Sequence, residues 1–421
     1  LANGRSADSV MIAKEYAQAR GIPEINLVRL SLPDHVGGAT RISPRDFESQ
    51  VLRPAQRAVD ERGLAGQILA WVYSTDFPTV VMTTPPVSLQ GFTFVRGRLP
   101  PTNEIHNGTY LSPLFAGPST PDTVGDRSQT FDVYREWLQT DMPLPSMMLG
   151  YAGPRGNTTD EIRQCLQTGR EADGTAPSGT VYFVVGQDIR SQCRHWQYPG
   201  ARAELAGMGV QARLVETLPP ASRDILGVMM GSAVVNPDRG KGYRPGCMAE
   251  HLTSLAGAFE HDGQTKLSVW IRAGATASAG TVVEPMAIWR KFPHARFYVH
   301  YAAGCSIMES FFQAVASPLQ ILLVGDPLAQ PWAPRATVEV EEWPGVVSDA
   351  VTLKAGARDE QGRFYGKIVY LIDGRRVASG RHVRLDTRDL APGRHTLRVV
   401  AYRTGLVRAQ AWMEKPFDVA R

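Results

Sequence analysis

The sequence lacks any stretch of about 20 consecutive apolar residues, the length that a helix needs to span a bilayer. It also lacks a large excess of charge of one sign, because the net charge is +4 over 421 residues and the basic residues are dispersed. Nucleic-acid-binding domains usually carry a clustered basic stripe. With 43% hydrophobic and 20% charged residues, the composition is that of a folded globular protein. The sequence therefore predicts neither a membrane span nor a nucleic-acid partner.

Cysteine is scarce, and none of its copies forms the C-x-x-C pair that is typical of a zinc site. An even number of cysteines fits two disulfides in an exported protein, and it fits four free thiols equally well. The residues are Cys165, Cys193, Cys247 and Cys305. Cofactor motifs are also missing. The glycines between Tyr151 and Asp160 lack the Gly-Lys-Ser/Thr ending of a phosphate loop, so no cofactor is predicted.

Two regions of different pattern divide the chain. In residues 1–330, helical periodicity alternates with nearly continuous apolar runs such as TVYFVVG at 180–186, which are typical of strands in a parallel sheet. This region is predicted to be an α/β domain with a mostly parallel sheet between helices, with a possible division into two subdomains near 125–180. After a proline-rich linker at 330–336, residues 336–421 alternate apolar and polar positions in short runs. That pattern predicts an antiparallel β-sandwich.

The chemistry is expected between 224 and 327, because strands, loops and helices alternate there and sites in open α/β sheets form at the carboxyl ends of strands. A helix is predicted to begin near residue 245, with Cys247 and His251 four positions apart on one face. A histidine beside a thiol can lower the thiol pKa and create a nucleophile. The plainer interpretation, a half-buried cysteine beside a surface histidine, is favoured, because catalytic dyads usually join different segments.

Two carboxylates also follow predicted strands. Glu284 comes after AGTVV, and Asp326 belongs to the Gly-Asp-Pro that follows LQILLV. A cation held by Glu284, Asp326 and loop carboxylates is one hypothesis, although no EF-hand loop is present. The plainer interpretations are a glutamate at a helix start and a turn. The turn is favoured, and no metal is predicted.

Three segments resemble an uncharacterised bacterial family known from planctomycetes and related phyla. They are GRSADSVMIAKEYAQARGIPEINLVRLSL at 4–32, AGTVVEP at 279–285 and LQILLVGDPLAQP at 319–331. This resemblance implies no activity that can be carried over. The last 85 residues or so, with VYLIDGRRVASG at 369–380, resemble the immunoglobulin-like domains that are appended to many bacterial exported proteins. That resemblance implies interaction or stabilisation rather than chemistry.

More distantly, the layout resembles the gingipain-type cysteine peptidases, with their caspase-like α/β fold and following immunoglobulin-like domain. Their pattern places a histidine in a Gly-His-Gly turn after one strand and a cysteine in Cys-x-x-Gly-x-Phe after the next. Here these positions fall on MMGSAV and SLAGAF, with Ser232 and Ser254 in place of histidine and cysteine. A shifted alignment would place Cys247 at the nucleophile, but no histidine then follows from the motif. Because two serines supply neither thiolate nor proton acceptor, the resemblance implies a caspase-like or Rossmann-like scaffold without peptidase chemistry.

The sequence therefore predicts an exported, non-catalytic protein, secreted, periplasmic or on the cell surface, that binds a protein or cell-envelope partner or has a structural role. The alternative is a cysteine or serine hydrolase that uses the 231–254 region. It would pair Cys247 with His251, or a serine with a base such as His106 in the long proline-rich loop at 78–127. Leu1 to Gly4 has the pattern of the end of a strand, which indicates that residues precede it and is compatible with a removed export signal.

Overall fold

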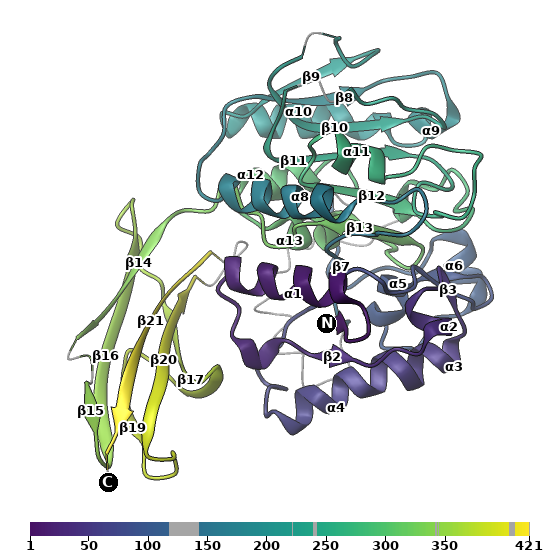
Figure 1. Ribbon diagram of the computed structural model, residues 1–421. Helices are drawn as coiled ribbons and strands as arrows, with labels where there is room; N and C mark the ends of the chain where they lie inside the picture. Colours follow the sequence, from purple (N-terminus) through teal and green to yellow (C-terminus); the bar gives the residue numbers. More distant parts are fainter. Residues whose placement is uncertain are drawn as a thin grey trace.

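The computed structural model describes residues 1–117, 143–220, 222–238, 242–341, 343, 345–403 and 409–420. They form a large α/β domain and a smaller C-terminal β domain. Figure 1 shows the β domain beside the part of the α/β domain that carries α1 (Ala7–Ala19) and α4 (Arg53–Glu61). Along these residues, no helix is long and apolar enough to cross a membrane.

An eight-stranded sheet is the centre of the α/β domain. In spatial order its strands are β4 (Trp71–Tyr73), β7 (Ser146–Met148), β13 (Ile321–Gly325), β12 (Ala277–Thr281), β11 (Tyr243–Leu252), β10 (Ile225–Gly231), β8 (Thr180–Val184) and β9 (Gln211–Val215). Neighbouring strands are parallel in every pair except β12 and β13. The prediction of a mostly parallel sheet is therefore confirmed. The division suggested near 125–180 lies partly outside the described residues, and both β7 and β8 belong to this one sheet.

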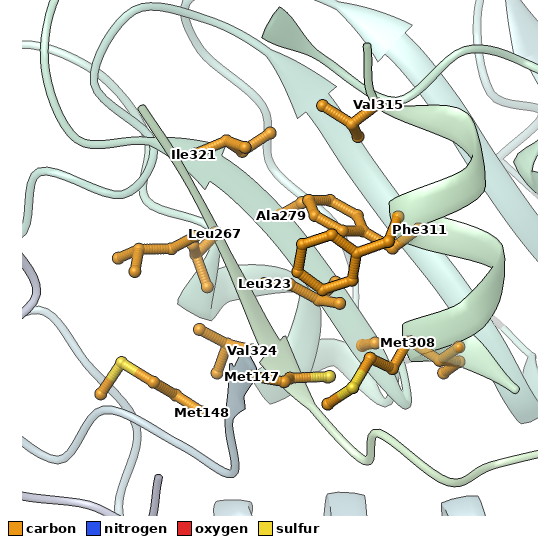
Figure 2. Packing of buried hydrophobic residues seen from close by; sticks show 14 of the residues in the cluster. Met147, Met148, Leu267, Ala279, Met308, Phe311, Val315, Ile321, Leu323 and Val324 are labelled. Atoms are coloured by element: carbon orange, nitrogen blue, oxygen red, sulfur yellow. The ribbon is translucent and has the colours of Figure 1, made fainter. Parts of the chain in front are cut away.

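Two groups of helices cover the sheet. They are α5 (Leu89–Phe94), α10 (Tyr198–Gly207), α12 (Phe297–Ala302) and α13 (Ile307–Ala314) in one group, and α1, α8 (Thr159–Ala172) and α11 (Ser268–Ala273) in the other. Figure 2 shows how α13 packs, with its Met308 and Phe311, and Val315 just after it, directed at the strands that carry Ala279 and Leu323. These side chains form one continuous apolar core.

Short elements connect the main ones. They are β1 (Ala2–Asn3), β2 (Arg29–Leu30), β3 (Arg41–Ile42), β5 (Val80–Val81), β6 (Val87–Ser88), α2 (Asp34–Gly37), α3 (Pro44–Phe47), α6 (Thr102–Asn107), α9 (Ile189–Gln192), a π-helical turn (Glu48–Leu52) and 3₁₀ turns (Glu24–Asn26, His195–Gln197 and Trp289–Lys291). The proline-rich stretch at 78–127 is thus not one long loop, because its described part contains β5, β6, α5 and α6.

The C-terminal domain is built from antiparallel strands, as predicted. One sheet has the order β14 (Ala336–Glu341), β16 (Ala350–Asp359) and β19 (His382–Asp386). The other has the order β15 (Val346–Val347), β21 (Gln410–Val419), β20 (Gly393–Tyr402), β17 (Lys367–Ile372) and β18 (Arg375–Ser379), with β15 parallel to β21. A second apolar core forms from buried side chains of both sheets, including Leu353, Tyr370 and Val399.

Candidate functional site

The carboxyl ends of β8, β10, β11 and β12 lie at one edge of the sheet, because these four strands are mutually parallel. Ser232 follows β10 directly, and Ser254 follows β11 after one residue. The backbone N–H of Ser232 donates to Leu252 O at 3.2 Å. On the other side, Thr281 Oγ1 donates to Ser254 O at 2.9 Å. The structure therefore brings the two serines to adjacent strand ends, where both side chains are half-buried.

The polar groups around these serines are bonded among themselves. Ser232 Oγ donates to Val234 O at 2.7 Å within its own turn. Gln264 Oε1 accepts from the N–H of Leu255 and from Thr253 Oγ1, both at 2.8 Å. An oxyanion hole needs backbone N–H groups that are free to bind a developing charge. The Leu255 N–H, which follows Ser254, already donates to Gln264 Oε1. Within the described residues, no basic or acidic side chain is bonded to the hydroxyl of Ser232 or Ser254.

Cys247 and His251 are not on a helix, and that prediction is wrong. Both lie on β11, where Cys247, Ala249 and His251 point to one face and Met248 to the other. Each residue advances a strand by about 3.3 Å, so side chains four residues apart are separated by about 13 Å along it. The helical spacing was misleading because both faces of this strand are buried. Apolar residues therefore occur at consecutive positions, and some of them recur at the spacing of a helix.

The surroundings of the two side chains also differ from those of a catalytic dyad. Cys247 is completely buried, and burial raises its thiol pKa well above the usual range. His251 Nδ1 accepts from the Trp270 indole N–H at 2.9 Å, and its Nε2 lies 3.1 Å from Thr265 O, to which it donates. Burial lowers the pKa of His251 to about 4, so the ring is neutral. A nucleophile needs a thiolate, which this environment disfavours.

A buried ion pair lies behind this edge, and the sequence analysis did not find it. Arg194, between α9 and α10, places Nη2 2.6 Å from Glu250 Oε1 on β11, with the arginine fully buried and the glutamate 1% exposed. Arg194 also donates to Pro293 O at 3.2 Å and to Met230 O. Burial raises the pKa of Glu250 to about 7, while Arg194 acts in the opposite direction. The pair ties the segment after β8 to the ends of β10 and β11.

Glu284 and Asp326 cannot share a cation, because they lie at opposite edges of the sheet. Glu284 follows β12, whereas Asp326 follows β13, which runs antiparallel to β12. The N–H of Asp326 donates to Thr276 O, the residue just before β12 begins. Glu284 is exposed and accepts from the N–H of Met286 at 2.9 Å. Among the described residues, no group of three or more His, Cys, Asp or Glu is placed to hold a metal ion.

Asp326 instead belongs to a buried network that joins α1 to the last strand. It is fully buried, accepts from the Tyr16 hydroxyl at 3.0 Å and pairs with Arg20. Arg20 also pairs with Asp173, at the end of α8. Burial raises the pKa of Asp326, and Arg20 opposes this effect. These contacts fix the helices on the sheet.

The remaining candidates are not assembled into a reactive site. All four cysteines are free, three of them buried and Cys193 half-buried, so the free-thiol alternative describes the structure and the disulfide alternative does not. His106 lies on α6, where its backbone carbonyl accepts from Lys291 Nζ at 2.7 Å. In the part of the chain that the structure describes, the His106 ring is not bonded to Ser232 or Ser254.

The same edge carries exposed apolar side chains in the segments that follow β8, β10 and β12. Ile189 follows β8 and is 57% exposed, Val234 follows β10 and is 70% exposed, and Met286 follows β12 and is 51% exposed. Single exposed apolar residues are common on protein surfaces, but several at one edge are typical of an interaction site. This feature depends on strand direction and exposure, which the sequence pattern did not reveal.

Comparison with known proteins does not identify a family. No family model matches the chain, and no curated protein matches it. Fibronectin(III)-like modules of Clostridium thermocellum CbhA align at 19% identity over 25% of this chain and 54% of theirs, with a TM-score of 0.18. A catalytically inactive OgpA from Akkermansia muciniphila, in complex with an O-glycopeptide (glycodrosocin) substrate, aligns at 8% identity over 58% of this chain and 96% of its own, with a TM-score of 0.20. At such TM-scores neither alignment carries an argument about fold or function.

Proposed function

We propose that this chain is an exported, non-catalytic binding or structural protein. In this proposal its α/β domain is a degenerate gingipain-like scaffold of the caspase-like type, and its C-terminal domain is immunoglobulin-like. The observation that carries the proposal is the bonding around Ser254. Gln264 accepts from both the Leu255 N–H and the Thr253 hydroxyl, so the polar groups at this strand end stabilise the loop. With Cys247 and His251 in the core, a thiol–imidazole pair has no place here.

The binding surface in this proposal is the edge formed by the loops after β8, β10 and β12. Ile189, Val234 and Met286 supply exposed apolar area there. Apolar side chains at the centre of an interface provide most of its binding free energy, and polar groups around them exclude water. The partner is a protein or another component of the cell envelope that presents apolar groups to this edge.

The absence of catalysis is tested with a broad mixture of peptides and a fluorophosphonate probe for activated serines. We expect no turnover and no labelling that depends on Ser254. The matched control is Ser49→Ala, because Ser49 is an exposed serine in the π-helical turn Glu48–Leu52 and belongs to none of the segments that follow β8, β10, β11 or β12. Cleavage that persists in Ser49→Ala and disappears in Ser254→Ala would establish a serine hydrolase and overturn the proposal.

The binding surface is tested by placing a photo-crosslinking residue at position 234 in the exporting cell and purifying the crosslinked partner. The purified partner is then titrated against Val234→Asp and Met286→Asp. The control is Met208→Asp, because Met208 is 42% exposed but precedes β9 and so lies at the opposite edge. We expect weakening of about tenfold or more from the first two variants and none from the third. Equal affinities for all three would place the binding surface elsewhere.

A further inference from the structure

The two sheets of the C-terminal domain have different surroundings. Trp412 on β21 lies against Gly21 of the α/β domain, and Arg398 on β20 donates to the Gly21 carbonyl. The five-stranded sheet therefore has its outer face turned toward the α/β domain. The three-stranded sheet of β14, β16 and β19 forms the other side of the sandwich. Figure 1 shows β14 and β16 on the side of this domain that is farther from α1.

Alternation along the strands decides which side chains lie on the outer face of the three-stranded sheet. Leu353, Ala355 and Ala357 on β16, and Val383 and Leu385 on β19, are buried in the core of the domain. The residues between them point away from that core. The exposed ones are Thr352, Lys354 and Arg358 on β16, and His382, Arg384 and Asp386 on β19.

The register of the two strands brings basic residues together. Lys354 lies opposite His382, and Thr352 lies opposite Arg384. The carbonyl of Arg381, just before β19, accepts from the Ala355 N–H at 2.9 Å, so this exposed arginine also lies beside β16. These residues come from separate segments of the sequence, and the sheet gathers them on one surface. We call the outer side of β16 and β19, with Lys354, Arg358, Arg381, His382 and Arg384, the basic face.

Phe364 holds two of these arginines at one end of the basic face. It forms an isolated antiparallel bridge with Arg358, and its side chain is 56% exposed. The guanidinium carbon of Arg358 lies 3.8 Å from the centre of the Phe364 ring, and that of Arg381 lies 5.8 Å from it. A ring face attracts a guanidinium without neutralising its charge, so both groups keep a full positive charge for a ligand.

The surface between these arginines and Lys354 is open. It is formed by Gly356, where an added Cβ would meet no atom within 4 Å. Lys354 and Arg358 lie two residues to either side of this glycine, so they are about 13 Å apart along the strand. The basic face therefore has room for a ligand group between its positive charges.

Three of the arginines have no acidic partner. Lys354 pairs with Glu341 on β14 at 2.7 Å. By contrast, Arg358, Arg381 and Arg384 form no ion pair within the described part of the chain. Positive charges that are exposed, close together and unpaired repel one another, and an anionic ligand removes that repulsion.

Acidic residues border the basic face and favour a narrow ligand. Glu339 and Glu341 are exposed along β14, on one side of β16. Asp386, which pairs with Arg388, lies at one end of β19. A planar anionic surface such as a membrane would also cover these carboxylates and be repelled by them. A linear chain can follow β16 and β19 and avoid them.

The basic face also lacks what a peptide or a single-stranded nucleic acid uses. β16 is bonded to β14 on one side and to β19 on the other, so it offers no strand edge to an added peptide strand. Bases stack on open aromatic rings, whereas the Phe364 ring already carries the Arg358 guanidinium.

We propose that the basic face binds a linear polysaccharide whose sugar rings carry carboxylates. Arg358, Arg381 and Arg384 bind the carboxylates, because a guanidinium presents two parallel N–H groups that match a carboxylate. The Thr352 hydroxyl and the open surface at Gly356 receive the neutral parts of the sugar rings between them. The basic face belongs to a different domain from the carboxyl edge of the large sheet, so this inference does not depend on the proposed function.

The test measures the affinity for polygalacturonate, a linear chain with one carboxylate on each sugar, by calorimetry at low ionic strength. Arg358→Gln combined with Arg384→Gln removes two charges from the basic face. The control, Lys367→Gln combined with Arg394→Gln, removes the same charge from exposed positions on β17 and β20 of the other sheet. We expect the first pair to weaken binding by about tenfold or more and the second by less than about twofold, because only the first loses charge-assisted hydrogen bonds.

Arg384→Gln alone keeps the test valid if the loss of the contact between Arg358 and Phe364 alters the fold, because Arg384 is exposed and has no ring or acidic partner. It should weaken binding several-fold without changing the thermal unfolding midpoint. Equal losses in the two double variants would show that binding follows net charge alone and would overturn the proposal. So would the absence of binding by the wild type. Tighter binding of oligothymidylate or of phosphatidylglycerol vesicles through the same arginines would assign the basic face to a phosphate-bearing partner instead.

Discussion

Replacing Arg194 by methionine should strongly destabilise the α/β domain, because it leaves a buried carboxylate without its partner. Arg194 is fully buried, and its Nη2 lies 2.6 Å from Glu250 Oε1. Breaking a buried pair by removing one member costs about 3–5 kcal/mol. The hydrogen bonds to Pro293 O and Met230 O are lost as well, at about 1 kcal/mol each. Against a typical total stability of about 5–15 kcal/mol, this change removes a large fraction.

Urea unfolding of the wild type, Arg194→Met, Glu250→Gln and the double variant measures the coupling between the two side chains. The double variant should be less destabilised than the sum of the single variants, because neither charge is then left alone. The loss in Arg194→Met should also be larger at pH 8 than at pH 5, and it should grow above about pH 7, the folded pKa of Glu250 in the wild type, because well below that pH the carboxyl is protonated in both folded proteins. Without the arginine, the folded pKa of Glu250 rises further above its ordinary value of 4.5, so the unfolded state releases the proton first as pH increases.

Two results would refute this reasoning. One is a loss below about 1 kcal/mol in Arg194→Met at pH 7, which would mean that the pair contributes no more than an exposed one. The other is a loss of the same size at pH 5 and pH 8, which would mean that the Glu250 carboxyl does not carry the cost.

Three further predictions concern buried groups and the domain junction. Burial lowers the pKa values of three histidines to about 3 to 4. As the pH drops from 6.5 to 4, the unfolded state therefore takes up protons before the folded state does. The free energy of unfolding, measured with urea, should fall over this range by up to ~1.4 kcal/mol per histidine and pH unit. These histidines are His251, His294 and His300. A thiol reagent should modify at most one cysteine in the native protein, Cys193, and four in denaturant, and fast native labelling that survives Cys193→Ser would contradict the burial of the others. Gly21→Ala should cost about 1–3 kcal/mol more than Gly63→Ala in thermal unfolding, because both glycines have positive φ but only the added methyl at Gly21 meets Trp412. Equal losses of stability in the two variants would show that the Trp412 ring moves aside for the added methyl group.

The parts of the fold that were predictable depend on local patterns. The helix that begins after Ser6 was found because its apolar residues recur at helical spacing, and Ser6 caps it by accepting from the Ser9 N–H. Parallel strands such as β8 were found because both of their faces are buried, which produces a continuous apolar run. The antiparallel strands of the C-terminal domain show the alternation of a sheet with one buried face.

The error at β11 has a physical reason that no local pattern could reveal. Glu250 and His251 are polar residues in a buried strand, where Arg194 forms an ion pair with the glutamate and Trp270 donates a hydrogen bond to the histidine, both from other segments. A polar pair beside apolar residues is typical of the exposed face of a helix. Only the long-range partners distinguish the two cases.

The direction of β13 explains why Glu284 and Asp326 lie at opposite edges of the sheet. Glu284 and Asp326 each follow an apolar strand, and in a fully parallel sheet both would lie at the same edge. The sheet has a single antiparallel pair among its described neighbours, β12 and β13, and this pair separates them. The direction of β13 is set by the route of α12 and α13, which return the chain to the edge where β12 ends.

The polar groups at the carboxyl edge are bonded within the loops that carry Ser232 and Ser254. Ser232 is bonded within its own turn, and Gln264 holds the two residues that flank Ser254. These bonds are local and neutral, so they stabilise the loops whether or not a ligand is present. A ligand that displaced these hydrogen bonds would gain little binding free energy, because it would have to form a new hydrogen bond to each polar group that lost its partner. For the binding surface proposed above, we therefore expect most of the binding free energy to come from the exposed apolar side chains, Ile189 and Val234 above all.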